Sequence, residues 1–66
     1  MAEELQRAER FLLRAEEVRS IAEDAHDKSV KESLLKIAAD YEKMAESLIS
    51  MHRSNAMLRA RLRSDE

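Results

Sequence analysis

The 66-residue chain contains no cysteine, no glycine and no proline. Without cysteine it can form neither a disulfide nor a thiolate zinc site, and it gains no support for an oxidising compartment. Glycine and proline are the residues most often found in the tight turns between β-strands, and the chain has neither. Alanine, leucine, glutamate, arginine and lysine dominate instead, which is the composition of long helices. We therefore expect an all-α protein.

Long apolar runs and aromatic side chains are also scarce. No segment approaches the roughly 18 to 20 apolar residues of a membrane span. The N-terminal segment MAEELQRAER is acidic and lacks the hydrophobic centre of a signal peptide. Phe11 and Tyr41 are the only aromatic residues, and both fall at predicted core positions. A cytoplasmic protein without membrane contact is expected.

The small size of the chain raises the question of what stabilises it. A domain of this length buries little apolar surface and commonly depends on a disulfide, a metal or a partner. His26 and His52 are the only histidines, and neither has a second histidine at a ligand spacing such as four residues. We expect no metal and no cofactor. Self-association, with a dimer favoured, is therefore the remaining way to stabilise the chain.

Apolar periodicity predicts two helices in one domain, helix 1 at about 3–25 and helix 2 at about 30–63, joined by a turn at about 26–29. In the first half, apolar residues recur at alternating spacings of three and four, as on one face of a helix. These residues are Ala8, Phe11, Ala15, Val18, Ala22 and Ala25. The predicted fold is an antiparallel helical hairpin with a longer second helix.

The polar stretch EDAHDKS, residues 23–29, interrupts the pattern. Ser29 followed three residues later by Glu32 has the form of a capping box, which predicts Ser29 as the N-cap of helix 2. Asp27 is the competing cap. A single bent or continuous helix remains an alternative, because no glycine marks the turn.

Two segments of the chain resemble one another, LLRAEEVRSIAED at 12–24 and LLKIAADYEKMAES at 34–47. With an offset of 23 residues, Leu12 matches Leu35 and Ala15 matches Ala38. Within them small residues recur every seven positions, which allows two antiparallel helices to approach closely. The small residues are Ala15 and Ala22 in the first segment and Ala38 and Ala45 in the second. Larger side chains are expected to fill the spaces between them: Phe11, Val18, Leu34 and Tyr41.

The second helix carries more apolar surface than the first can cover. Its three-four alternation continues from Val30 to Leu62 over more than four heptads, as in coiled coils. We expect the residues that do not face the first helix to form an oligomer interface, in a four-helix bundle or a coiled coil. The predicted interface residues are Ile37, Met44, Met51, Asn55, Leu58 and Leu62. Asn55 either sets register by pairing with another amide or is exposed near the end of the helix.

The C-terminal segment is basic, with four arginines that precede Asp65 and Glu66: Arg53, Arg59, Arg61 and Arg63. Cations near a helix C-terminus complement the macrodipole, so a solvated or subunit-pairing helix end explains them. They are also candidates for a nucleic-acid contact. No aromatic side chain is interleaved with them, so the stacking part of a single-strand site is missing.

Nothing in the sequence predicts an enzyme. The carboxylates lie on predicted solvated faces, where Glu16, Glu17, Glu23 and Asp24 are expected to pair with Arg19, Arg14 or Lys28 of neighbouring turns. The chain has no glycine-rich phosphate loop and no set of nucleophile, base and orienting residue.

Residues 5–47 resemble a group of short helical proteins, without an assigned activity, from alphaproteobacteria of the rhizobial kind. The resemblance is carried by Arg14, Ala15, Glu16, Glu17, Ala22 and Glu23, then by Leu34, Leu35, Ile37, Ala38, Tyr41, Glu42, Met44, Ala45 and Glu46. Relatives often have proline after the turn aspartate, where this chain has Lys28. The resemblance implies no activity, cofactor or ligand.

These features together predict a self-associating helical module with a structural or protein-interaction role. A helical protein of different sequence is a further candidate partner. The alternative is a small nucleic-acid-binding regulator that uses the basic C-terminal segment.

Overall fold

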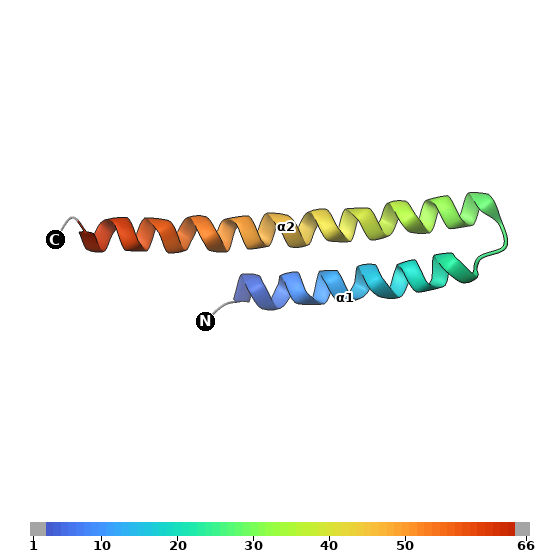
Figure 1. The fold of residues 1–66 in the computed structure, drawn as a ribbon, viewed down its shortest axis with the longest axis horizontal. Coiled ribbons are helices and arrows are strands. Elements are labelled where there is room, and N and C mark those ends of the chain that lie inside the picture. The colour runs from blue at the N-terminus through green and yellow to red at the C-terminus, as the bar shows by residue number, and fades with distance from the viewer. Residues whose placement is uncertain (1–2, 65–66) are drawn as a thin grey trace.

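The computed structural model describes residues 3–64 and consists of two helices, α1 (Glu3–Asp24) and α2 (Lys28–Ser64). They lie side by side and antiparallel, and the C-terminal part of α2 extends beyond α1 (Figure 1). No strand is present within residues 3–64. The predicted all-α hairpin with a longer second helix is confirmed.

The turn occupies residues 25–27, one residue earlier than predicted at its start and two earlier at its end. At the end of α1, the backbone N–H of Ala25 donates to the carbonyl oxygen of Ala22 at 3.2 Å. No residue of the described chain has a positive φ. The connection therefore closes with negative φ angles alone, which every residue type adopts readily, and this explains how a hairpin forms without glycine.

Asp27 is the N-cap of α2. Its Oδ1 accepts a hydrogen bond from the backbone N–H of Ser29 at 2.8 Å and a longer one from Val30 at 3.4 Å. The prediction that Ser29 caps the helix is wrong, because α2 begins at Lys28 and Ser29 already lies inside its first turn. The N–H of Ser29 is one of the unpaired donors of that turn, and the carboxylate of Asp27 satisfies it.

Alanines form the interior of the hairpin. The alanine seam consists of Ala8, Ala15 and Ala22 on α1 and Ala38 and Ala45 on α2, each at most 2% exposed. Within residues 3–63 no other side chain is buried to this degree. Because alanine has only a methyl group, the two backbones approach closely, but little apolar area is removed from water.

Two contacts flank the alanine seam on opposite sides. The rings of Phe11 and Tyr41 stack with their centroids 5.9 Å apart and their planes at 27°. On the other side, Arg19 and Glu42 form a two-armed ion pair, with N–O distances of 2.6 and 2.5 Å. These two pairs connect α1 to α2 on either side of the alanine seam.

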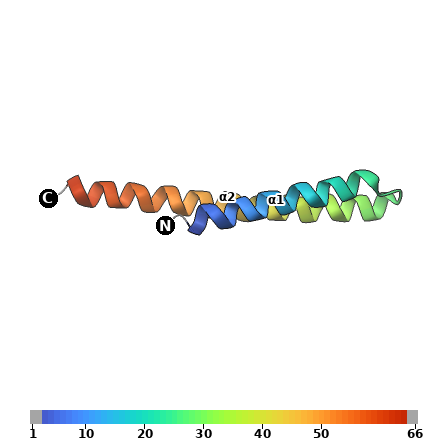
Figure 2. The same ribbon diagram turned by 90° about the horizontal axis from the view of Figure 1, so that it is seen from below.

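The molecule is elongated, with principal extents of 60 × 17 × 10 Å and a radius of gyration of 16.7 Å. A compact chain of this length would have a radius of gyration of about 11 Å. Its accessible surface is 5738 Å², whereas a compact monomer of this mass exposes about 4,300 Å². Figure 2 shows the same narrow rod from a second direction. Neither helix, within the described residues, combines the length and apolar character needed to cross a membrane.

Candidate interaction surface

A row of five exposed apolar residues runs along α2. They recur every seventh position, which two turns of a helix bring back to the same face. This apolar strip consists of Val30, Ile37, Met44, Met51 and Leu58, whose exposed fractions range from 45% to 56%. Each strip residue directly precedes a position of the alanine seam or its continuation, so the apolar strip lies along one face of the hairpin. A continuous exposed row of this kind is typical of an interaction surface.

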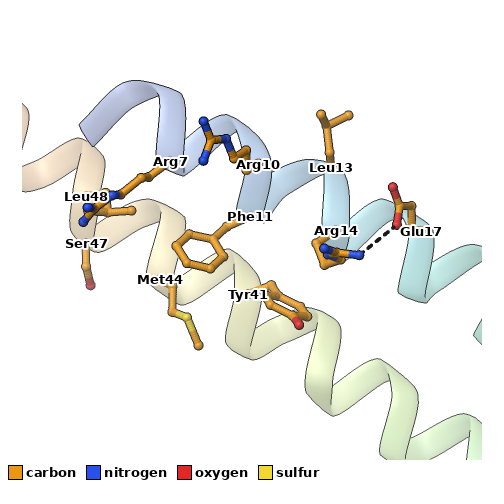
Figure 3. A pocket seen from close by; sticks show the side chains of 10 residues that line it. All are labelled: Arg7, Arg10, Phe11, Leu13, Arg14, Glu17, Tyr41, Met44, Ser47 and Leu48. Carbon is orange, nitrogen blue, oxygen red and sulfur yellow. Dashed lines mark ion pairs between the residues drawn. The ribbon is translucent and has the colours of Figure 1, made fainter. Parts of the chain in front are cut away.

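An open groove lies beside the centre of the apolar strip (Figure 3). Phe11 points from α1 toward α2, and Tyr41, Met44 and Leu48 of α2 complete the apolar floor. The rim on α1 carries three cations and one anion, with Leu13 between them: Arg7, Arg10, Arg14 and Glu17. Arg14 also lies 3.8 Å from Glu17 one turn along α1. The groove was not predicted, because it depends on which residues of the two helices lie at the same level.

The opposite face of the hairpin is interrupted by charge. Arg19 and Glu42 lie there, and exposed leucines lie seven residues away on the same side of each helix, Leu12 on α1 and Leu35 on α2. The hydrogen bond with Arg19 holds the pKa of the Glu42 carboxyl below its ordinary value, and the same hydrogen bond with the carboxylate raises the pKa of Arg19. An ion pair in the middle of this face separates its apolar residues. The apolar strip is therefore the more continuous of the two surfaces.

The Arg19–Glu42 pair corrects an expectation from the sequence. Arg19 was expected to pair with carboxylates on its own helix, but its guanidinium donates to Glu42 on α2. Of the predicted pairs within α1, Arg14 with Glu17 is present. One signal was available, because Arg19 and Glu42 are separated by 23 residues, the offset of the sequence repeat. They therefore occupy equivalent positions beside the alanine seam on the two helices.

The last part of α2 has no neighbour on α1. Nδ1 of His52 lies 3.9 Å from Oε2 of Glu4, in the first turn of α1. Residues 53–64 continue beyond that level, and we call them the overhang (Figure 1). Leu58 and Leu62 are 56% and 68% exposed there. Asn55 is exposed too, so its predicted role in register depends on a second chain and stays a prediction.

Four arginines of the overhang are exposed: Arg53, Arg59, Arg61 and Arg63. At about 100° per residue, Arg59 and Arg63 fall on one side of α2, and Arg53 and Arg61 fall on another. They therefore lie on both sides of Leu58 and Leu62 instead of forming one cationic face. Asp65 and Glu66, which follow in the sequence, lie outside the described residues.

Side chains that could bind a metal are dispersed over the surface of the described residues. No group of three or more histidine, cysteine, aspartate or glutamate side chains within residues 3–64 could hold a metal ion. His26 is exposed in the turn. No polar or charged side chain is buried in residues 3–63. The apolar strip and its groove are therefore the surface on which a function can be argued.

Comparisons of the chain with protein-family models, with curated proteins and with solved structures find no match.

Proposed function

We propose that this protein is a self-associating helical module in which the apolar strip of α2 packs against a second copy of the chain. Two hairpins joined in this way form a four-helix bundle over the level where α1 is present. Such a bundle serves a structural or protein-interaction role. The observation that carries the proposal is the apolar strip, half exposed along the whole of α2.

The buried interior of one hairpin supports the proposal. Its fully buried side chains, within the described residues, are all alanines, which contribute little hydrophobic stabilisation. The larger apolar side chains stay partly in water, among them Leu12, Ile37 and Met51. A second copy would supply the apolar contacts that one hairpin lacks.

The excess surface has the size that a dimer needs. The chain exposes 5738 Å², about 1,400 Å² more than a compact monomer of its mass. A specific interface of standard size buries about 800 Å² on each partner. One copy of this chain therefore has enough excess surface for such an interface. A two-fold symmetric dimer presents the same patch on both copies, and the apolar strip meets that requirement because all five members are apolar.

The alternative function is binding of nucleic acid through the overhang. It is favoured by four arginines without any carboxylate in residues 53–64. It is opposed by their distribution around α2 and by the absence of aromatic side chains among them. Retention on nucleic acid that falls steeply as salt rises would support this alternative. The cytoplasmic location stays a prediction from the sequence.

Replacement of Met51 by glutamate tests the proposal. A carboxylate in the interface would be buried without a partner in the dimer but solvated in the free hairpin. We expect Met51→Glu to raise the dissociation constant by about 100-fold or more. Sedimentation should then show the 7.6 kDa chain at concentrations where the parent sediments as a larger species.

Ser50→Glu is the matched control, because Ser50 is exposed on the adjacent residue of α2 but lies off the apolar strip. It introduces the same charge and should leave the sedimenting mass unchanged. The proposal is wrong if the parent itself is a stable helical monomer at micromolar concentration. It is also wrong if Met51→Glu keeps the parent mass.

A further inference from the structure

The overhang and the turn end of the hairpin both expose apolar side chains. On the overhang, Leu58 and Leu62 have no cover from α1. At the turn end, Ile21 of α1 is 58% exposed, and Val30 and Ile37 of α2 are exposed as well. The apolar strip connects the two ends, because Val30 is its first member and Leu58 is its last. A second copy must cover both ends if it covers the apolar strip.

Two hairpins can pack face to face around a two-fold axis in two ways. With the α2 helices parallel, each α2 lies over the α1 of the other copy. The positions of α1 that then meet the apolar strip include Arg7 and Arg14, which line the groove. Charged side chains would be buried beneath apolar ones, which is costly without partners. With the α2 helices antiparallel, each α2 lies over the other α2 and the apolar strip meets itself, while each α1 lies over the other α1, so Arg7 and Arg14 face polar side chains instead of the apolar strip.

The length of α2 sets the register of the antiparallel arrangement. The midpoint of Lys28–Ser64 is Glu46, and full overlap places the two-fold axis at that level. Leu62 then lies opposite Val30 of the second copy, and Leu58 lies opposite Leu34. Nearer the centre, Met44 lies opposite Leu48. The overhang of each copy therefore covers the turn end of the other.

The distribution of charge favours the same orientation. The overhang carries four arginines and no carboxylate, whereas residues 3–52 carry twelve carboxylates and eight lysines or arginines. At the turn end, Glu17 and Asp24 of α1 lie on the same side of the helix as Ile21 and Arg14, at about 100° per residue. Antiparallel packing brings the arginines of one overhang toward these carboxylates, although Lys28, Lys31 and Lys36 of α2 also lie at the turn end. Parallel packing would bring the eight arginines of two overhangs together.

One residue favours the parallel orientation. Parallel α2 helices would place the two Asn55 amides at the same level, where they could bond to each other. In the antiparallel register, Asn55 lies opposite Ile37. This single polar contact is outweighed by the repulsion between the overhang arginines and by the burial of Arg7 and Arg14 beneath the apolar strip, which only the parallel orientation requires.

We infer that the second copy docks antiparallel, an inference that rests on the proposed function. Leu58 and Leu62 of each overhang then pack on Val30 and Leu34 at the turn end of the other copy. The turn end of one chain is therefore a binding site for the C-terminal overhang of another. The same contact is made twice, once at each end of the dimer, and it closes the assembly.

Cysteine cross-linking tests the orientation directly, because the chain has no cysteine of its own. A disulfide requires two Cα atoms within about 7 Å. Positions 30 and 62 of one helix are about 48 Å apart, at 1.5 Å per residue, so they cannot be joined within one chain. The variants are Val30→Cys, Leu62→Cys and the double variant that carries both substitutions.

We expect mild oxidation to convert the double variant into a covalent dimer of defined size, while each single variant remains a single chain on a non-reducing gel. The control double variant carries Leu62→Cys with Lys36→Cys, because Lys36 is exposed about 100° around α2 from the apolar strip. It should form few cross-links. Circular dichroism and sedimentation under reducing conditions check that each variant keeps the helicity and mass of the parent.

Each other outcome overturns the inference in a recognisable way. Efficient cross-linking of either single variant shows parallel packing. A ladder of three or more chains from the double variant shows an open, head-to-tail assembly. Equal cross-linking of the control shows random collision. In all three cases a parent chain that sediments as a dimer leaves the proposed function intact, whereas a monomeric parent contradicts both the proposed function and the antiparallel orientation.

Discussion

At the scale of single residues, the turn shows how one side chain selects the start of a helix. Two candidates lay two residues apart, and the carboxylate of Asp27 bonds to the N–H groups of Ser29 and Val30. An aspartate at this position also carries negative charge toward the positive end of the α2 dipole. The hydroxyl of Ser29 lies inside the first turn, where no cap is needed.

Removal of the cap should destabilise the protein measurably. Asp27→Ala is expected to lower the free energy of unfolding by about 1 kcal/mol. Ser29→Ala, the matched control, should change it by much less. The measurement is urea denaturation followed by circular dichroism at one fixed protein concentration. Equal losses of unfolding free energy in the two variants would mean that Ser29 contributes to the cap as much as Asp27.

The Arg19–Glu42 pair predicts a dependence of stability on pH. The pKa of the Glu42 carboxyl is held below its ordinary value of 4.5 by the hydrogen bond with Arg19. The unfolded chain therefore binds a proton at Glu42 at a higher pH than the folded chain does. The stabilisation is present above the ordinary value and is lost as the pH falls from there through the lowered pKa.

Glu42→Gln should therefore be less stable than the parent at neutral pH, and the difference between them should shrink as the pH falls below about 4. Glu17→Gln removes the same charge from the longer contact with Arg14, and serves as the control. The free energies of unfolding are compared from pH 7 down to pH 3. A difference that stays constant over this range would mean that the ion pair contributes nothing to stability.

At the scale of the helices, the alanine seam determines how closely α1 and α2 approach. Ala38 and Ala45 are 0% exposed, so any larger side chain there pushes the backbones apart. The stacked rings of Phe11 and Tyr41 and the Arg19–Glu42 pair both depend on this spacing. Alanine is thus required here for its small size and not for its apolar character alone.

Enlargement of the alanine seam should be destabilising even though it adds apolar surface. Ala38→Leu is expected to cost about 1 to 3 kcal/mol through overpacking. Ala39→Leu is the matched control, because Ala39 is only partly buried and lies one residue around α2. Thermal denaturation of both variants separates the cost of overpacking from the effect of added apolar surface. If both variants are as stable as the parent, the close approach of the helices is not what holds the hairpin.

At the scale of the whole molecule, a thin rod with an alanine interior is a poor isolated domain. Its radius of gyration is 16.7 Å, and much of its apolar surface is accessible. Folding and association are therefore expected to be coupled, since each hairpin gains its larger apolar contacts only from the second copy.

The coupling should appear as a dependence on protein concentration. We expect the midpoint of thermal unfolding to rise as the concentration of the chain rises, because dilution favours the marginal free hairpin. Circular dichroism over a hundredfold range of concentration measures this effect. A midpoint that does not move would describe a hairpin that folds independently of its partner.

Ionic strength should distinguish the two orientations of the dimer independently of cross-linking. Screening weakens both the attraction of the overhang arginines to the carboxylates of the turn end and their repulsion from the lysines there, so added salt should change the affinity of an antiparallel dimer little. It should tighten a parallel dimer, in which eight arginines repel one another. Comparison of the dissociation constants measured by sedimentation at low and high salt distinguishes the two orientations.

The sequence by itself determined two helices, their order and the faces they bury. Local propensity and a seven-residue recurrence of alanine need no long-range information, so Ala15, Ala22, Ala38 and Ala45 could be placed at the contact in advance. Four residues of the apolar strip, Ile37, Met44, Met51 and Leu58, could likewise be named as lying outside that contact, and the structure shows them exposed. Their role as an interface stays a prediction.

Only the tertiary structure decided which residues of α1 and α2 lie at the same level. A seven-residue repeat matches itself equally well after a slip of seven, so periodicity does not select one register. The turn selects it, and the turn depends on whether Asp27 or Ser29 supplies the cap. Once α2 begins at Lys28, Arg19 reaches Glu42 and Phe11 stacks on Tyr41, and the groove forms beside Met44.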